Sequence, residues 1–315
     1  MVPSPSIAVL CNPRARGAAR DPMLPDRLRR ITGHLGLVKV TWDVEAIPDA
    51  VDASRKAGCT VYAVCGGDGA SMHVLSALRS CFGSAMPPVA LLPAGTVNTV
   101  ARRIGVQGNA EAALRRLVAM LESGAQLPLV EHDTLEVGPL EGPSRVGFIF
   151  GAGLVSSFFE LYSQANMSGR LWAAAQIGRI FVGSFVGSGF ASRVIAPVEA
   201  TLSIDGEASP LERFTLLLAS TLRDVGLGLR VTYRAGSAPG KFHIVGTDLP
   251  ATRLGPQLTR VLRGQRLAAE PLVDAVAGQA LLSFGAEARY LLDGELFAAQ
   301  SVQVRAGPRV RFAVP

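Results

Sequence analysis

The chain has 315 residues, a length that favours about two domains. Hydrophobic residues make up 49% of the sequence and charged residues 18%, which excludes a disordered chain and supplies enough apolar side chains for sizeable cores. The formal net charge of +6 fits contact with phosphates or anionic surfaces, but charge alone does not identify a partner.

The first part of the chain alternates between short apolar runs and segments with helical spacing. Apolar strands separated by helices of this kind are typical of βαβ units and predict a parallel sheet. The expected strands cover residues 7–10, 37–42, 60–64 and 89–92, and the expected helices cover residues 21–35, 46–57, 71–78, 96–104 and 110–121.

The pattern changes near residues 124–128, which read Gly-Ala-Gln-Leu-Pro. Beyond them, β-like runs between Gly/Pro turns predict a second, largely β domain, either a sandwich or a barrel. These runs cover residues 131–137, 145–150, 194–204, 214–218, 242–245, 280–284 and 302–310. Segments 154–162 and 171–185 instead carry bulky apolar side chains at helical spacing.

We therefore expect an α/β domain over residues 1–127 and a β-sandwich domain over residues 128–315. The extreme C-terminus could pack back on the first domain. No leader-like segment opens the chain, and the most apolar stretch, residues 171–190, is interrupted by Gln176 and Arg179. These features predict a cytoplasmic protein without a transmembrane segment.

The four cysteines form no CxxC pair, so a disulfide framework or a zinc site is not expected. They are Cys11, Cys59, Cys65 and Cys81. Those that lie in apolar runs predict buried thiols in a reducing compartment.

Three of the expected strands end in unusual loops, at residues 11–17, 66–71 and 93–98. The carboxyl ends of parallel strands are where such sheets bind ligands. Glycine-rich turns bring backbone N–H groups close to an anion, and a following helix adds its positive end. One such loop could equally be an ordinary tight turn, but three at successive strand ends indicate a polyphosphate site, with Arg14 or Arg16 adding charge.

Together with one further motif, these loops resemble the ordered signature of the diacylglycerol kinase catalytic-domain family, which includes bacterial lipid kinases and sphingosine kinases. The motifs are Asn12-Pro13 with Gly17, then Gly66-Gly67-Asp68-Gly69, then Pro93-Ala94-Gly95-Thr96-Val97-Asn98, and finally Asp293-Gly294-Glu295. The resemblance implies an α/β nucleotide-binding domain with a parallel sheet, similar to NAD kinases, followed by a mainly-β sandwich domain.

The resemblance also implies that the cofactors are ATP and Mg²⁺. The positions that match the family's nucleotide contacts are Asn12, Thr41, Gly66, Gly67, Asp68, Gly69, Ala70, Ser71, Met72, Gly95, Thr96 and Asn98. Thr96 could hydrogen-bond a phosphate oxygen.

Three carboxylates are candidates for the catalytic role. The resemblance implies that Glu295 accepts the proton of the acceptor hydroxyl, with Asp293 beside it, whereas some relatives assign the base to the Asp of the glycine loop, here Asp68. The sequence leaves both assignments open. A carboxylate suits either position because it can take the hydroxyl proton as the phosphoryl group moves. Taken alone, Asp293-Gly294 would indicate only a hairpin turn.

The chain also departs from the family pattern. Family loops usually read Gly-Gly-Asp-Gly-Thr followed by Asn-Glu-Val, but here Ala70 replaces the Thr and His73 replaces the Glu. Ser71 could supply the lost hydroxyl. The segment that matches the family's structural Mg²⁺ site, residues 234–243, contains no carboxylate, and a hard cation needs oxygen ligands. We therefore leave the metal ligands unassigned.

The first functional hypothesis is an ATP-dependent lipid kinase that phosphorylates a diacylglycerol- or sphingoid-like hydroxyl in phospholipid metabolism. Its lipid substrate would be reached peripherally at the membrane surface, and the apolar segment 154–185 could form a pocket for acyl chains. The alternatives are a kinase of a soluble alcohol or nucleotide, and a nucleotide-binding protein that has lost turnover. We expect no nucleic-acid partner and leave a homodimer open.

Overall fold

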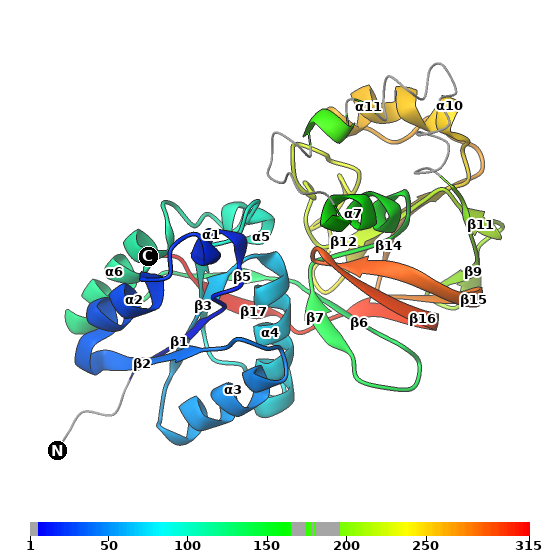
Figure 1. The fold of residues 1–315 in the computed structure, drawn as a ribbon. Coiled ribbons are helices and arrows are strands. Elements are labelled where there is room, and N and C mark those ends of the chain that lie inside the picture. Colours follow the sequence, from blue (N-terminus) through cyan, green and yellow to red (C-terminus); the bar gives the residue numbers. More distant parts are fainter. Residues whose placement is uncertain (1–5, 165–173, 178, 180–195) are drawn as a thin grey trace. The chain divides into compact units, whose positions relative to one another are not determined.

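The computed structural model describes residues 6–164, 174–177, 179 and 196–315 (Figure 1). The fold divides into two compact units. Unit 1 comprises Met1–His132 and Pro308–Pro315, and unit 2 comprises Asp133–Gly307. Most of the helical segment expected over residues 171–185 lies outside the described residues.

Unit 1 is built on a six-stranded sheet with the order β2-β1-β3-β4-β17-β5. The strands are β1 (Ile7–Cys11), β2 (Gly36–Val40), β3 (Val61–Gly66), β4 (Val89–Pro93), β5 (Leu129–His132) and β17 (Val310–Ala313). The first four strands are parallel, and β1 and β3 are buried at every position, as continuous apolar runs require in a sheet covered on both faces. The predicted parallel-sheet α/β domain is thus confirmed.

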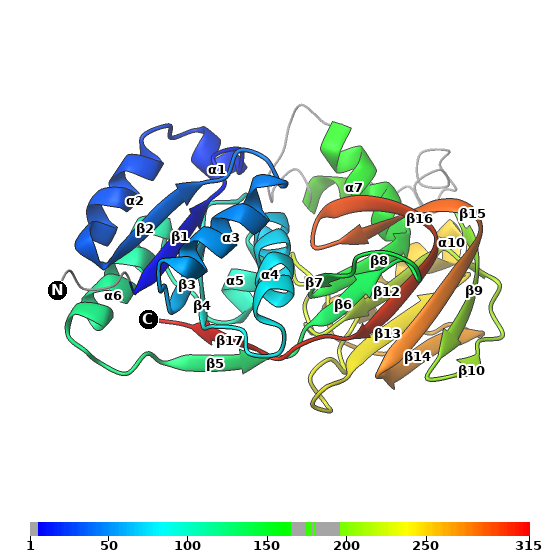
Figure 2. The same cartoon turned by 90° about the horizontal axis from the view of Figure 1, so that it is seen from below.

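Helices cover both faces of this sheet (Figure 2). They are α1 (Arg16–Ala19), α2 (Leu24–Thr32), α3 (Ala46–Lys56), α4 (Asp68–Phe82), α5 (Thr99–Arg103) and α6 (Ala110–Glu122), with a 3₁₀ turn at Gly33–Leu35. Helices α2 and α6 pack on one face, where Leu28 and Leu114 join a core with Val9 and Ala63. Helices α3 and α4 lie on the other face.

Helix α4 begins three residues earlier than the sequence predicts. The apolar spacing predicts a helix from residue 71, but α4 begins at Asp68, inside the glycine-rich loop. Gly67 is extended and Ser71 donates its backbone N–H to the Gly67 carbonyl, which closes the first helical turn. The glycine loop therefore leads directly into a helix N-terminus, and the apolar period becomes visible only one turn later.

The end of the chain returns to unit 1. The sequence predicts one strand over residues 302–310, but the structure ends β16 at Ala306 and begins β17 at Val310. Gly307 donates its N–H to the Thr134 carbonyl between the two strands. Strand β17 then pairs parallel with β4 and antiparallel with β5, so that the last strand of the chain is placed inside the first sheet.

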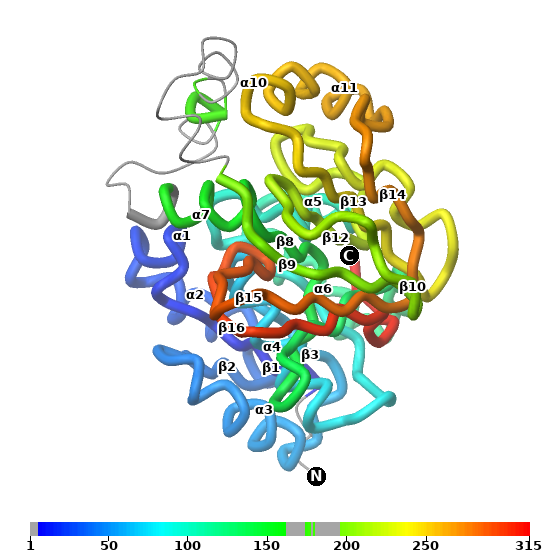
Figure 3. The backbone as a smooth tube through the Cα atoms, turned by 90° about the vertical axis from the view of Figure 1, so that its right-hand side faces the viewer, coloured from blue at the N-terminus to red at the C-terminus, as the bar shows by residue number. Residues whose placement is uncertain are grey.

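Unit 2 is an antiparallel β unit, which confirms the predicted mainly-β second domain. Its described strands form one hydrogen-bonded set of eleven, and β9, β15 and β16 run side by side (Figure 3). They are β6 (Leu135–Gly138), β7 (Arg145–Gly147), β8 (Ile149–Gly153), β9 (Val198–Ile204), β10 (Glu207–Ala208), β11 (Arg213–Phe214), β12 (Leu216–Ser220), β13 (Phe242–Thr247), β14 (Leu272–Ala277), β15 (Gln279–Leu292) and β16 (Glu295–Ala306).

Short helical segments accompany the strands of unit 2, among them residues 174–177 and three others. These three are α7 (Leu154–Gln164), α10 (Ala251–Leu254) and α11 (Leu258–Leu262), with a 3₁₀ turn at Gly255–Gln257. Among the residues that the structure describes, no helix is long and apolar enough to cross a bilayer. The cysteines are free thiols: Cys11, Cys59 and Cys65 are buried and Cys81 is half-buried.

Candidate functional site

The three unusual loops lie at the same edge of the unit 1 sheet. They follow β1, β3 and β4, which are parallel neighbours in the sheet order. Because the carboxyl ends of parallel strands meet at one edge, the loops form a continuous rim there. The backbone links the first two directly, since Asn12 donates its N–H to the Cys65 carbonyl at 2.9 Å.

The loops after β1 and β4 touch through a glycine. Gly17, in α1, donates its backbone N–H to the Ala94 carbonyl at 2.9 Å. A Cβ atom at position 17 would press against that same carbonyl oxygen more closely than real Cβ atoms come. Only glycine lets the two loops approach this closely.

The loops after β3 and β4 also meet at glycines. A Cβ atom added to Gly95 would lie 2.5 Å from the Cα atom of Gly67, and one added to Gly66 would collide with the Ala70 side chain. Ala94 donates its N–H to the Gly66 carbonyl at 2.9 Å, which fixes the two loops together. The predicted glycines therefore pack the loops closely together, with the N–H groups of Gly17 and Gly95 bonded within the protein, and the N-terminus of α4 is the part of this edge that favours an anion.

Asp68 holds two of these elements in place. Its carboxylate accepts the backbone N–H of Thr99 at 2.9 Å and that of Val100 at 3.0 Å, so a side chain from α4 satisfies the N-terminus of α5. Burial raises the pKa of the Asp68 carboxyl, and the two backbone hydrogen bonds offset only part of that effect. Both carboxylate oxygens of this candidate base are thus used within unit 1.

Asn98 has a second positioning role that the sequence reasoning missed. It adopts a left-handed conformation with φ of 51°, which asparagine tolerates better than most residues. Its Oδ1 accepts the Gly95 N–H at 2.9 Å, and its Nδ2 donates to the Gly95 carbonyl at 3.0 Å. A short loop that combines glycine and asparagine was the available signal for this local clamp.

The other predicted nucleotide-binding residues divide by burial. Ala70 and Met72 are buried in α4, so their side chains belong to the core, and Ser71 donates its hydroxyl to the Gly67 carbonyl at 3.1 Å. Gly69 and Thr96 are half-buried on the rim.

Two predicted nucleotide-binding residues, Asn12 after β1 and Thr41 after β2, form hydrogen bonds that stabilise the ends of these strands. Thr41 is 5% exposed, and its backbone N–H donates to the Cys11 carbonyl at 2.9 Å. The side-chain Oδ1 of Asn12 accepts the Arg14 N–H at 2.9 Å, which stabilises the turn after β1.

The Asp293-Gly294-Glu295 tripeptide lies in unit 2, at the turn between β15 and β16. Asp293 and Gly294 both have positive φ, at 47° and 89°, as in the hairpin turns that Asp-Gly favours. The Asp293 side chain is nearly buried, and its Oδ1 accepts the backbone N–H of Ile149 at 2.9 Å. The Phe148 N–H donates to the same carboxylate at 3.0 Å. Asp293 therefore fixes the turn to the β7–β8 segment, and Glu295 follows it as a half-buried side chain.

This segment also corrects a predicted element. The sequence predicts one strand over residues 145–150, but β7 ends at Gly147 and β8 begins at Ile149. The N–H of Phe148 between them is taken by the Asp293 carboxylate instead of a strand neighbour. The polar partner comes from the far end of the sequence, so local patterning could not reveal the break.

The described residues do not form a metal site. No group of three or more His, Cys, Asp or Glu side chains gathers among them in a way that could hold an ion. Asp68 and Asp293 each accept backbone N–H groups with both carboxylate oxygens. This donor set does not fit a resident Mg²⁺, which needs free oxygen ligands.

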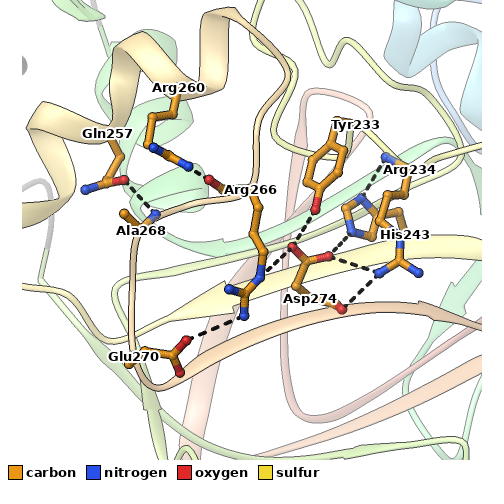
Figure 4. Close-up of polar contacts among 9 residues, drawn as sticks. All are labelled: Tyr233, Arg234, His243, Gln257, Arg260, Arg266, Ala268, Glu270 and Asp274. Atoms are coloured by element: carbon orange, nitrogen blue, oxygen red, sulfur yellow. Dashed lines mark hydrogen bonds and ion pairs between the residues drawn. The ribbon is translucent and has the colours of Figure 1, made fainter.

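The segment 234–243, where the resemblance implied a structural metal, is occupied by a different arrangement (Figure 4). Its central carboxylate is Asp274 on β14, with a side chain that is 5% exposed. His243 contributes Nε2 at 2.8 Å from Oδ1, and Tyr233 donates its hydroxyl to Oδ2 at 2.8 Å. The His243 Nδ1 accepts the Arg234 N–H, which leaves the ring proton on Nε2 for Asp274.

Two guanidinium groups complete this arrangement. Arg234 Nη1 lies 3.3 Å from Oδ1 of Asp274, and Arg266 Nε lies 3.7 Å from Oδ2 (Figure 4). Burial raises the pKa of the Asp274 carboxyl, but the hydrogen bonds from His243 and Tyr233 outweigh it and leave the pKa below its usual range. Protein donors therefore supply the positive charge that a cation would otherwise bring to this carboxylate.

Comparison with known proteins confirms the resemblance over unit 1. Residues 6–127 match the family model of the diacylglycerol kinase catalytic domain. Proteins named "Probable lipid kinase YegS" from Escherichia fergusonii and Shigella flexneri are each 34% identical to this chain over 82 residues. That segment is 26% of this chain and 27% of each relative, so the chain matches these relatives over far less than two thirds of their length.

Two crystal structures from Bacillus anthracis str. Sterne share the fold over both units. Their TM-scores are 0.68 and 0.63, at 15% and 13% sequence identity, and the second is described as a diacylglycerol kinase. The matches cover 98% of this chain and 95% and 97% of those chains. At such identities the likeness shows the fold alone.

Proposed function

Because residues 6–127 match the diacylglycerol kinase catalytic domain, we propose that the protein is an ATP-dependent lipid kinase. It transfers the γ-phosphoryl group of ATP to a hydroxyl of a diacylglycerol- or sphingoid-like lipid, which it reaches from the cytoplasm at the membrane surface. Such an activity belongs to phospholipid metabolism.

The observation that carries the proposal is the contact among the three loops of unit 1. Gly17 and Gly95 stand where side chains would force these loops apart. The rim follows the carboxyl ends of parallel strands and leads into the N-terminus of α4, which favours negative charge there. A triphosphate is the ligand that matches a rim of backbone N–H groups extending over three loops.

Among the three candidate carboxylates, we assign the proton acceptor to Glu295. Asp68 and Asp293 each accept backbone N–H groups from neighbouring elements, which fixes their carboxylates in place as local acceptors. Glu295 is half-buried at the start of β16, directly after the constrained Asp-Gly turn. Asp68 and Asp293 are then positioning residues for the glycine rim and for Glu295, respectively.

The magnesium ion of the reaction would arrive with the nucleotide. Mg²⁺ binds mainly through substrate phosphates and water in kinases and needs few protein ligands. The described carboxylates provide no resident site for it, so no step is assigned to a protein-bound metal. What the chain supplies is a fixed backbone surface for the phosphates and a carboxylate for the hydroxyl proton.

The lipid acceptor is supported by apolar side chains beside the Asp-Gly turn. The Phe159 ring of α7 comes within 3.6 Å of the position that a Cβ atom on Gly294 would take. The rings of Phe158 and Phe159 also contact each other edge to face, with centroids 5.9 Å apart. An aromatic surface next to the proposed base suits an acceptor that carries acyl chains better than it suits a fully polar alcohol.

The proposal is tested by incubating the protein with γ-labelled ATP and a total lipid extract. A labelled product in the organic phase supports a lipid kinase. Label that is transferred only to aqueous metabolites would instead favour a kinase of a soluble alcohol or nucleotide. ATP binding in calorimetry without transfer to any acceptor would indicate a nucleotide-binding protein that lacks turnover.

A substitution at Glu295 tests its proposed role as the proton acceptor. We expect Glu295→Gln to bind ATP like the wild type while turnover falls by about two orders of magnitude, because the amide cannot accept the hydroxyl proton. Glu287→Gln, an exposed position on the same hairpin, is the matched control and should keep full turnover. Unchanged turnover in Glu295→Gln would remove Glu295 from this role.

A further inference from the structure

One large aromatic side chain of unit 1 is exposed at the edge that carries the glycine rim. Trp42 follows the end of β2 and is 60% exposed, although tryptophan is usually one of the more buried side chains in a folded protein. Val44, two residues later, is 45% exposed. The loop between β2 and α3 therefore presents an apolar surface to solvent.

The loop lies next to the first turn of the rim. Thr41 donates its backbone N–H to the Cys11 carbonyl at 2.9 Å, so Trp42 comes directly beside the turn that begins at Asn12. Strand β2 pairs with β1, and β1 pairs with β3. With neighbouring strands about 4.8 Å apart, the end of β2 is roughly 10 Å from the glycine turn after β3. A nucleotide whose phosphates lie on the glycine turns would have to extend along this edge.

The loop is held at both sides of the indole. Thr41 is buried and anchored on β1, and Asp43 forms an ion pair with Arg14 at 3.1 Å. Arg14 belongs to the turn after β1, so the ion pair joins the Trp42 loop to the proposed phosphate rim. The backbone on both sides of Trp42 is thereby tied to the turn after β1, so it loses little freedom when the exposed indole takes a ligand.

We propose that Trp42 is the base-binding residue of the nucleotide site and that its indole stacks on the purine ring. This inference rests on the proposed function and adds the part of the ligand that the glycine rim does not explain. Stacking reads the face of the ring and not its exocyclic groups. The site would therefore accept purine triphosphates as a class, with ATP and GTP bound similarly and the bare triphosphate bound more weakly.

The experiment compares ATP with inorganic tripolyphosphate by calorimetry, on the full chain. Trp42→Ala should weaken ATP binding about tenfold while tripolyphosphate binding stays as in the wild type, because only ATP carries a ring to stack. Trp42→Phe keeps an aromatic face and should recover most of the ATP affinity. Met23→Ala is the control, since Met23 is another exposed apolar side chain of unit 1, at 55%.

The outcomes separate this inference from the proposed function. If Trp42→Ala binds ATP as the wild type does, or loses ATP and tripolyphosphate to the same extent, the stacking role is wrong and the kinase proposal is unaffected. A wild-type protein that binds tripolyphosphate as tightly as ATP would also overturn it. If the wild type binds neither ligand, the proposed function fails and the inference fails with it.

Discussion

Asp68 in unit 1 and Asp274 in unit 2 both carry buried carboxylates, but the groups around the two carboxylates differ. Asp68 accepts the backbone N–H groups of Thr99 and Val100 at the start of α5, together with the Thr99 side chain. Asp274 accepts from a buried histidine and a tyrosine hydroxyl and lies beside two guanidinium groups. The pKa of Asp68 is raised by its burial, whereas the hydrogen bonds around Asp274 leave its pKa lowered.

The difference shows how each unit is held together. In unit 1 the carboxylate holds two backbone N–H groups and thereby fixes the start of α5 beside the glycine loops. In unit 2 the side-chain donors and cations saturate the carboxylate and leave no place for a metal or an anion. The first arrangement builds a candidate site, and the second builds a structural crosslink between β13, β14 and the segment that carries Tyr233.

The largest effect is expected for Asp274→Ala. It leaves the fully buried His243 and the Tyr233 hydroxyl without their acceptor and removes the carboxylate beside Arg234 and Arg266. We expect the free energy of unfolding to fall by about 3 kcal/mol. Urea denaturation measures it, with Asp248→Ala as the control, because Asp248 forms only a long 3.8 Å ion pair with Arg213. A loss within about 0.5 kcal/mol would show that the network is dispensable.

A smaller loss of stability, about 2 kcal/mol, is expected for Asp68→Ala. It removes the acceptor of two backbone N–H groups at a helix start, but no charged partner is left behind. ATP binding should weaken as well, because the start of α5 after the Gly95 loop is no longer held to α4. If Asp68→Ala unfolds as the wild type does and still binds ATP, Asp68 has no positioning role.

The pH dependence should be the smallest effect, and it has opposite signs at the two sites. The lowered pKa of Asp274 means that its stabilisation is present above the ordinary Asp pKa, near 3.9, and is lost as the pH falls through the lowered value. The raised pKa of Asp68 means that the folded state binds the extra proton, so the contribution of Asp68 to stability falls as the pH rises from the ordinary pKa through the raised one.

Unfolding free energies from about pH 3 to pH 7 test these signs. The difference between the wild type and Asp274→Asn should shrink toward low pH. The difference between the wild type and Asp68→Asn should shift in favour of the wild type toward low pH. Slopes of the same sign at both positions would contradict the contrast between the two environments.

The sequence predicted the parts of the fold that depend on local pattern. Buried apolar strands such as β1 and β3, with helices between them, are visible in the spacing of their residues, and the glycine turns are visible in their composition. The separation of β16 from β17 was missed although a turn signal, Gly307-Pro308, lies between Ala306 and Val310. What the local pattern could not show is the partner of each piece, because β17 pairs with β4 and β5 in the other sheet.

The dependence on distant partners also decides which parts of the candidate site could be predicted from the sequence. The glycines were predicted from the motif, since their role depends on the absence of a side chain. The positioning roles of Asp68 and Asn98 depend on which backbone N–H groups lie opposite their side chains, and these pairs are visible only in the folded structure. The Asp274 network was missed for a similar reason: segment 234–243 has no carboxylate, and its acceptor comes from a strand about thirty residues further on, which pairs with β13 only in the folded sheet.

Hydrogen exchange with and without saturating ATP examines the glycine rim without any substitution. Backbone amides in residues 12–17, 66–72 and 94–99 should all exchange more slowly when ATP is bound, while amides around Asp274 should exchange at unchanged rates. If ATP binds and leaves the exchange of all three loops unaltered, the rim is not the nucleotide site and the proposed kinase mechanism is wrong.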